Sequence, residues 1–262
     1  MLGAIIGDIV GSRFEWNNHK SKDFQFFSTE CFFTDDSVMT LAVGQALLNN
    51  KGQLDGLSDE AIKCMRTLGR IYPTRGYGES FFQWLMSENP VPYYSYGNGA
   101  AMRVSACGYV ADSFTNAKDL SRVVTKVTHN HPEGIKGAEA VAVAVYMARQ
   151  KESIPTIKRY IANNYYAFEY SLKEIREYYE FDPSCQGTVP QAMQAFFEST
   201  SFEDAIRNAI SIGGDSDTIG AITGGIAGAY YGIPDEIRKI ALCYLDKRLL
   251  GILKKFEKVY GK

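Results

Sequence analysis

The stretch GGDSDTIGAITGGIAGAYYG, residues 213–232, decides how this chain folds. Within it Gly220, Gly224, Gly228 and Gly232 recur every four residues, a spacing that places them along one face of a helix. Glycine inside a helix costs about 0.5–1 kcal/mol relative to alanine. Four glycines along one helix face, which we call a glycine stripe, incur this cost several times. Such a stripe predicts that another helix packs very closely against that face.

The first residues of the chain carry a matching stripe, because Gly3, Gly7 and Gly11 also recur every four residues. We expect the two helices to pack against each other at the centre of a bundle. Glycine stripes of this kind also join helices within membranes. The apolar run 219–234 is about fifteen residues long, too short to span a bilayer, so a membrane role is not predicted.

Helical periodicity recurs through most of the sequence, whereas strand signals are scarce. Only residues 24–33 have the aromatic density of an extended segment, and we expect them to form a loop. We find no linker and no repeat. The sequence therefore predicts an all-α fold, a compact orthogonal multi-helix bundle that forms one domain over residues 1–262. The ranges predicted as helix are 1–15, 37–50, 58–70, 100–111, 117–128, 134–150, 171–180, 189–198, 203–212, 217–231 and 235–257.

The composition is that of an ordinary globular protein, with 45% hydrophobic and 22% charged residues. The net charge is −2 and the pI is about 6.0, so no overall positive field favours nucleic acid or an anionic membrane. The five cysteines are widely spaced and include no C-x-x-C pair, which argues against a structural zinc site. This pattern favours a reducing, cytoplasmic location.

Two acidic clusters are the main functional signal. One is Thr34-Asp35-Asp36-Ser37 and the other is Asp215-Ser216-Asp217-Thr218, and each begins an apolar helical pattern. Two like charges about 4 Å apart repel by roughly 4 kcal/mol at an effective dielectric constant near 20. Neither cluster contains a Lys or Arg, so divalent cations are the simplest counter-charge if the fold brings the clusters together.

Carboxylate and hydroxyl oxygens are ligands for magnesium, manganese or calcium rather than zinc. The alternative interpretation is that each cluster is only an N-cap, whose oxygens accept hydrogen bonds from the first turn of a helix. Two such clusters together favour a metal-dependent hydrolase.

The segment Tyr93-Tyr94-Ser95-Tyr96-Gly97-Asn98-Gly99-Ala100-Ala101-Met102-Arg103 is a second candidate site. Aromatic residues precede a glycine-rich turn that leads into a predicted helix. Such a segment can stack a base or ribose while backbone N–H groups approach a phosphate. It lacks the features of a P-loop and the strand of a dinucleotide-binding fold, so a simple turn is the alternative.

Thr128-His129-Asn130-His131 contains two of the three histidines. An H-x-H pair can ligate zinc, but no third ligand lies nearby in the sequence, and we expect His129 to donate a hydrogen bond to a phosphate or ribose instead. Glu15, expected at the end of the first helix, is a candidate general base. The alternative interpretation is that Glu15 is a solvated carboxylate at a helix end, with no role in catalysis.

Taken in order, these motifs resemble the ADP-ribosylglycohydrolase family over essentially the whole chain. The resemblance rests on Gly7-Asp8-x-x-Gly11-x-x-x-Glu15, the two acidic clusters, the Gly97-Asn98-Gly99 segment and Thr128-His129. It implies an all-α fold with two Mg²⁺ or Mn²⁺ ions. It also implies hydrolysis of the glycosidic bond that joins ADP-ribose to a protein side chain or a small acceptor, so the implied partners are ADP-ribose and its conjugates.

The resemblance assigns a role to each matching residue. It implies Thr34, Asp35, Asp36, Asp215, Asp217 and Thr218 as metal ligands, and Gly97, Asn98, Gly99 and His129 as substrate contacts. We also expect Tyr96 and Met102, in the same glycine-rich segment, to contact the substrate. Glu15 is the first candidate for general base and Asp36 the second. A glutamate at position 15 resembles the serine-linked hydrolases and modestly favours an O-linked acceptor over arginine.

Two other functional classes remain open at this point. A non-catalytic descendant would bind ADP-ribose or serve as a scaffold without turnover. A nucleotide phosphoesterase would use the same carboxylates but cleave the diphosphate instead of releasing intact ADP-ribose.

Overall fold

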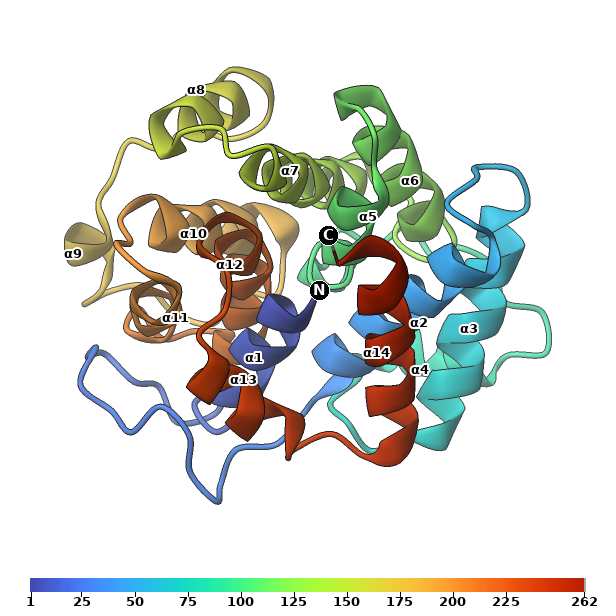
Figure 1. Cartoon of the computed structure of the whole chain (residues 1–262), viewed down its shortest axis with the longest axis horizontal. Helices are drawn as coiled ribbons and strands as arrows, with labels where there is room; N and C mark the ends of the chain where they lie inside the picture. Colours follow the sequence, from blue (N-terminus) through green and yellow to red (C-terminus); the bar gives the residue numbers. More distant parts are fainter. Residues whose placement is uncertain (262) are drawn as a thin grey trace.

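The protein is described by a computed structural model of residues 1–261, in which every regular element is a helix (Figure 1). The predicted all-α fold is confirmed. The last residue of the expected domain, 262, lies outside the described residues. The helices are α1 (Leu2–Gly11), α2 (Asp35–Asn49), α3 (Leu57–Ile71), α4 (Glu79–Met86), α5 (Ser105–Val110), α6 (Phe114–Lys126), α7 (Pro132–Arg149), α8 (Ile154–Asn164), α9 (Leu172–Ile175), α10 (Cys185–Phe197), α11 (Phe202–Ile210), α12 (Ser216–Tyr231), α13 (Asp235–Leu242) and α14 (Lys247–Tyr260), with a 3₁₀ turn, η1 (Asn98–Ala100).

The two glycine stripes pack against each other, as the sequence predicts. A side chain at Gly7 would place its Cβ 1.9 Å from the carbonyl oxygen of Gly220, and one at Gly3 would lie 2.1 Å from that of Gly224. No residue larger than glycine fits this crossing. Helix α1 consequently contacts α12 more extensively than any other two described helices contact each other, and all ten of its residues are buried.

The remaining helices surround this central pair (Figure 1). Helices α10 and α11 cover α12 on one side, while α2 joins the pair to α3 and α14 on the other. One hydrophobic cluster runs through all of these contacts. No helix within residues 1–261 combines the length and apolar character needed to cross a lipid bilayer, and the five cysteines form no disulfide.

Several helix boundaries differ from those predicted. The first helix ends at Gly11 instead of residue 15. The range 235–257 contains two helices, because the Asp246 carboxylate caps α14 by accepting from the N–H groups of Arg248 and Leu249. Helices α4 and α8 were not predicted from the periodicity, and only residues 172–175 of the range 171–180 are helical.

Candidate active site

The N-termini of α2 and α12 meet at one cavity of about 520 Å³. Helix α1 contacts both of these helices, and its packing therefore brings together two acidic clusters that are far apart in the sequence. The chain continues from α1 into a turn that delivers Glu15 to the same cavity. Of the predicted site residues, Glu15, Asp35, Asp36, Gly97, Asn98, Gly99, Met102, His129, Asp215, Asp217 and Thr218 line it.

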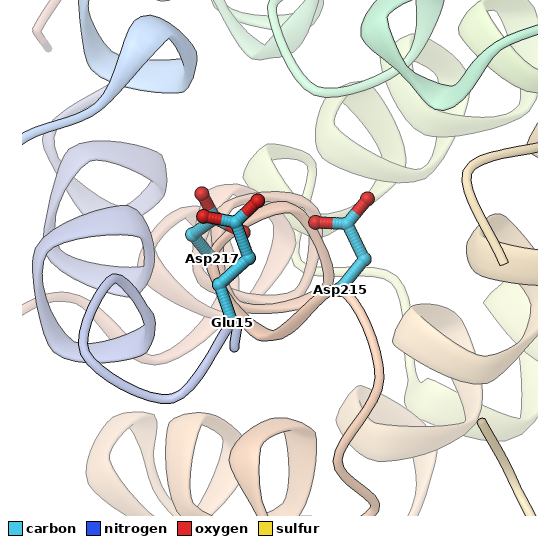
Figure 2. A group of neighbouring side chains, drawn as sticks. All are labelled: Glu15, Asp215 and Asp217. Atoms are coloured by element: carbon cyan, nitrogen blue, oxygen red, sulfur yellow. The ribbon is translucent and has the colours of Figure 1, made fainter. Parts of the chain in front are cut away.

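Glu15, Asp215 and Asp217 form the closest group of carboxylates (Figure 2). One oxygen of each lies within 4.8 Å of the corresponding oxygens of the other two. Asp215 and Asp217 are buried, while Glu15 is half-buried and comes from the turn beyond α1. The expectation that Glu15 sits on a helix end is therefore corrected, because the helix stops at Gly11 and the turn carries the side chain inward.

Burial raises the pKa of these acids. Glu15 has its pKa raised to about 7, first by desolvation and then by the charges of Asp215 and Asp8. Burial also raises the pKa of Asp217 well above its usual value, with Asp215 as the next cause. The pKa of Asp36 is raised well above its usual value by burial and by the charge of Asp35. Each pKa is raised because burial desolvates the carboxylate and neighbouring carboxylates repel its charge.

The structure fits a cationic occupant of this cluster. The Oδ2 atom of Asp36 accepts from the hydroxyl of Thr218 at 3.2 Å, whereas its Oδ1 is buried and has no hydrogen-bond partner. Among residues 1–261, no Lys or Arg forms an ion pair with the carboxylates of Glu15 or the two acidic clusters. Buried carboxylates without a protein counter-charge are a set of hard oxygen donors suited to divalent cations.

Asp8 supports the candidate site from behind, a position that the sequence reasoning did not assign to it. It is fully buried and accepts from the backbone N–H of Thr34 at 3.0 Å, the hydroxyl of Thr34 at 2.7 Å and the N–H of Ser37 at 3.0 Å. Burial raises its pKa to about 6 despite these hydrogen bonds. Asp8 thus fixes the first turn of α2 to α1. An aspartate inside an otherwise apolar helix was the available signal.

Thr34 lies beside the cavity without lining it. Its hydroxyl donates to Asp8 and accepts from the N–H of Asp36 at 3.2 Å, so it caps α2. A hydroxyl oxygen has two lone pairs, and one of them remains available to a cation. The N-cap interpretation and the ligand interpretation are therefore compatible at this residue.

The Gly97-Asn98-Gly99 turn forms a wall of the same cavity. The amide nitrogen of Asn98 donates to Asp215 Oδ2 at 2.6 Å and to the hydroxyl of Thr188 at 3.0 Å, which ties the turn to the second acidic cluster. None of these three residues has a positive φ. The backbone conformation therefore does not require the glycines, whereas their surroundings leave little room for a side chain, because a Cβ at Gly99 would lie 3.3 Å from His129 Nε2.

The two histidines of the H-x-H pair have separate roles. His131 caps α7, with its Nδ1 accepting from the N–H of Glu133 at 3.1 Å, and its ring packs against the exposed Tyr94 and Tyr96. His129 is buried beside the glycine turn and lines the cavity. Tyr96 is half exposed and stands outside the cavity lining.

Comparison with known proteins identifies the family to which this chain belongs. The sequence matches the ADP-ribosylglycohydrolase family over residues 1–257. The chain belongs to the ADP-ribosylglycohydrolase family. It is similar to ADP-ribosylhydrolase ARH3 of Xenopus tropicalis, with 26% identity covering 88% of this chain and 86% of that protein. It is also similar to ADP-ribosylarginine hydrolase Tri1 of Pseudomonas putida, with 24% identity covering 92% of this chain and 73% of that protein.

A solved structure described as an ADP-ribosylglycohydrolase-related protein complex shares the fold. Its TM-score is 0.69 at 22% identity, and the match covers 98% of this chain and 95% of that one. The ADP-ribosylglycohydrolase assignment makes the protein an enzyme of the glycohydrolase class, as the motifs predict.

Proposed function

We propose that this ADP-ribosylglycohydrolase hydrolyses the bond between ADP-ribose and an oxygen-linked acceptor, with two divalent cations, Mg²⁺ or Mn²⁺, held by the acidic clusters. The observation that carries the proposal is the convergence of Glu15, Asp215 and Asp217 in a cavity that also contains the glycine turn and His129. The proposed ligands are Thr34, Asp35, Asp36, Asp215, Asp217 and Thr218. Bound divalent ions would polarise a water and stabilise charge as the bond breaks.

The residues of the chain supply the rest of the chemistry. A carboxylic acid with a pKa near 7 is well matched to proton transfer at neutral pH, which makes Glu15 the proposed general base. It would take a proton from the attacking water or help the acceptor leave. Asp36 is the second candidate, because its Oδ1 has no partner in the protein.

The cavity also suggests an orientation for the substrate. The distal ribose would lie at the carboxylate end, since the bond to be broken must reach Glu15. The diphosphate would lie along Gly97 and Gly99, where no side chain intervenes, with His129 beside it. We propose that Tyr96 and Met102 contact the nucleoside part.

The test is a parallel assay of ADP-ribose release from serine-linked, arginine-linked and O-acetylated substrates, with Mg²⁺, Mn²⁺ or excess chelator. We expect release from the O-linked substrates with either ion and none in chelator. Release from the arginine-linked substrate alone would overturn the acceptor assignment. Free phosphate or a cleaved diphosphate would instead identify a phosphoesterase, and binding without turnover would identify a pure ADP-ribose binder.

A further inference from the structure

Arg103 is completely buried, which is unusual for a guanidinium. Within the described part of the chain it forms no ion pair, and its Nε and Nη1 atoms have no hydrogen-bond partner. Its one hydrogen bond runs from Nη2 to the hydroxyl oxygen of Thr128 at 2.6 Å. The guanidinium also lies over the ring of Phe81, with Cζ 5.5 Å from the ring centroid. An unpaired buried charge is costly, so the single hydrogen bond calls for an explanation.

The hydroxyl of Thr128 also contacts the next residue, with Oγ1 2.8 Å from His129 Nδ1. A guanidinium only donates, so Arg103 occupies a lone pair of Oγ1 and leaves the hydroxyl proton to another acceptor. Three acceptors lie near this proton, namely His129 Nδ1 at 2.8 Å, the carbonyl oxygen of Thr125 at 3.4 Å and the phenol oxygen of Tyr93. The shorter contact is the stronger hydrogen bond, so the proton points to Nδ1.

An accepting Nδ1 fixes the state of the ring. Burial and the nearby charge of Arg103 lower the pKa of His129 well below its usual value, so the ring is neutral at physiological pH. A neutral imidazole whose Nδ1 accepts carries its proton on Nε2. That nitrogen adjoins the glycine turn, since a Cβ at Gly99 would lie 3.3 Å from it and one at Gly97 3.5 Å.

We infer that Arg103 and Thr128 are positioning residues that hold neutral His129 as the Nε2–H tautomer, so that the cavity presents a fixed hydrogen-bond donor to an oxygen of the ligand. We call the hydrogen bonds from Arg103 to Thr128 and from Thr128 to His129 the relay. Without the relay, Nε2 could equally be the unprotonated nitrogen, whose lone pair would repel a phosphate oxygen. The identity of the ligand as ADP-ribose rests on the proposed function. The tautomer does not.

Nitrogen NMR of the protein labelled with ¹⁵N-histidine tests the tautomer in the wild type. We expect the His129 Nδ1 resonance of an unprotonated ring nitrogen and the Nε2 resonance of a protonated one, with His129→Gln providing the assignment. The opposite pattern would overturn the inference. This measurement stands even if ADP-ribose does not bind, an outcome that would count against the proposed function alone.

Variants of neighbouring threonines test the relay. Thr128→Val removes the hydroxyl, so we expect a mixed tautomer and a dissociation constant for ADP-ribose that rises roughly 3–10-fold, the usual worth of one hydrogen bond. Thr128→Ser should restore both. Thr125→Val is the matched control, because Thr125 lies in the last turn of α6, three residues before Thr128, and its hydroxyl is buried and has no hydrogen-bond partner. Wild-type affinity and tautomer in Thr128→Val would contradict the relay.

Discussion

Glu15 owes its proposed role to its surroundings, since a glutamate in water would be fully ionised at neutral pH. Glu15→Gln keeps the size of the side chain but cannot exchange a proton. We expect the single-turnover rate of hydrolysis to fall by roughly 10²–10⁴-fold while ADP-ribose binds as before. Glu152→Gln is the control, because Glu152 is exposed and does not line the cavity. A Glu15→Gln rate within about two-fold of wild type, far short of that range, would remove Glu15 from the chemistry.

The lowered pKa of His129 predicts how the free energy of unfolding depends on pH. Its pKa in the folded protein lies well below 6.5, whereas in the unfolded chain it is near 6.5. The unfolded state therefore binds the extra proton first, and the free energy of unfolding falls as pH drops below 6.5 by up to about 1.4 kcal/mol per pH unit.

In His129→Gln that contribution is absent. Urea unfolding of both proteins at about pH 7.5 and about pH 5 should show a smaller loss of stability in the variant, since it lacks the His129 titration while the other titrating groups are common to both proteins. Equal losses in the two proteins would contradict the buried neutral state of the ring.

Among single residues, the sequence indicated those candidate site residues whose type alone suggests a chemical role, such as a metal ligand or a general base. The structure places the aspartates, the glycine turn, His129 and Glu15 at one cavity. These residues could be selected from the sequence because carboxylates and glycines stand out within apolar patterns. Asp8 and Arg103 were not assigned, because their roles depend on what the fold places beside them. The second hydrogen bond of Asn98, to Thr188, is invisible in the sequence for the same reason.

Among the helices, the crossing of α1 and α12 yields the sharpest stability prediction. Gly7→Ala would drive a Cβ into the backbone of Gly220, and we expect destabilisation of 3 kcal/mol or more, about the upper end of overpacking costs. Gly251→Ala is the matched control, because nothing lies within 4 Å of its added Cβ in α14, and it should stabilise by about 0.5–1 kcal/mol. Thermal unfolding measures both. A tolerated Gly7→Ala would mean that the helices can separate.

The helices that the periodicity did not predict show where local patterns fail. Helix α4 reads ESFFQWLM, and its eight residues are too few for the five apolar positions to establish a helical period. Helix α8 had usable signals, an N-cap serine and a proline in its first turn, although only two of its residues are buried. The end of α1 was misplaced because the chain turns to deliver Glu15, a tertiary demand that overrides local preference.

For the whole molecule, the cluster of uncompensated carboxylates predicts that divalent cations stabilise the fold. Binding only to the folded state at 100 times the dissociation constant adds about 2.7 kcal/mol, so Mg²⁺ or Mn²⁺ should raise the melting temperature and chelator should lower it. Asp35→Ala and Asp217→Ala should lose both this rise and activity while keeping their helical circular dichroism. Asp55→Asn, at an exposed position, is the control. An unchanged melting temperature in excess chelator would contradict the metal proposal.

The glycine crossing also constrains how the protein is made. All ten residues of helix α1 are buried in the folded protein, yet its partner α12 is synthesised about 200 residues later. At roughly 5–20 residues per second, that wait lasts on the order of ten seconds or more. During this interval the apolar side chains of the nascent helix lack the partner that buries them in the folded protein. The candidate active site, which draws on residues from the turn that follows α1 and from α12, can assemble only after α12 has been translated.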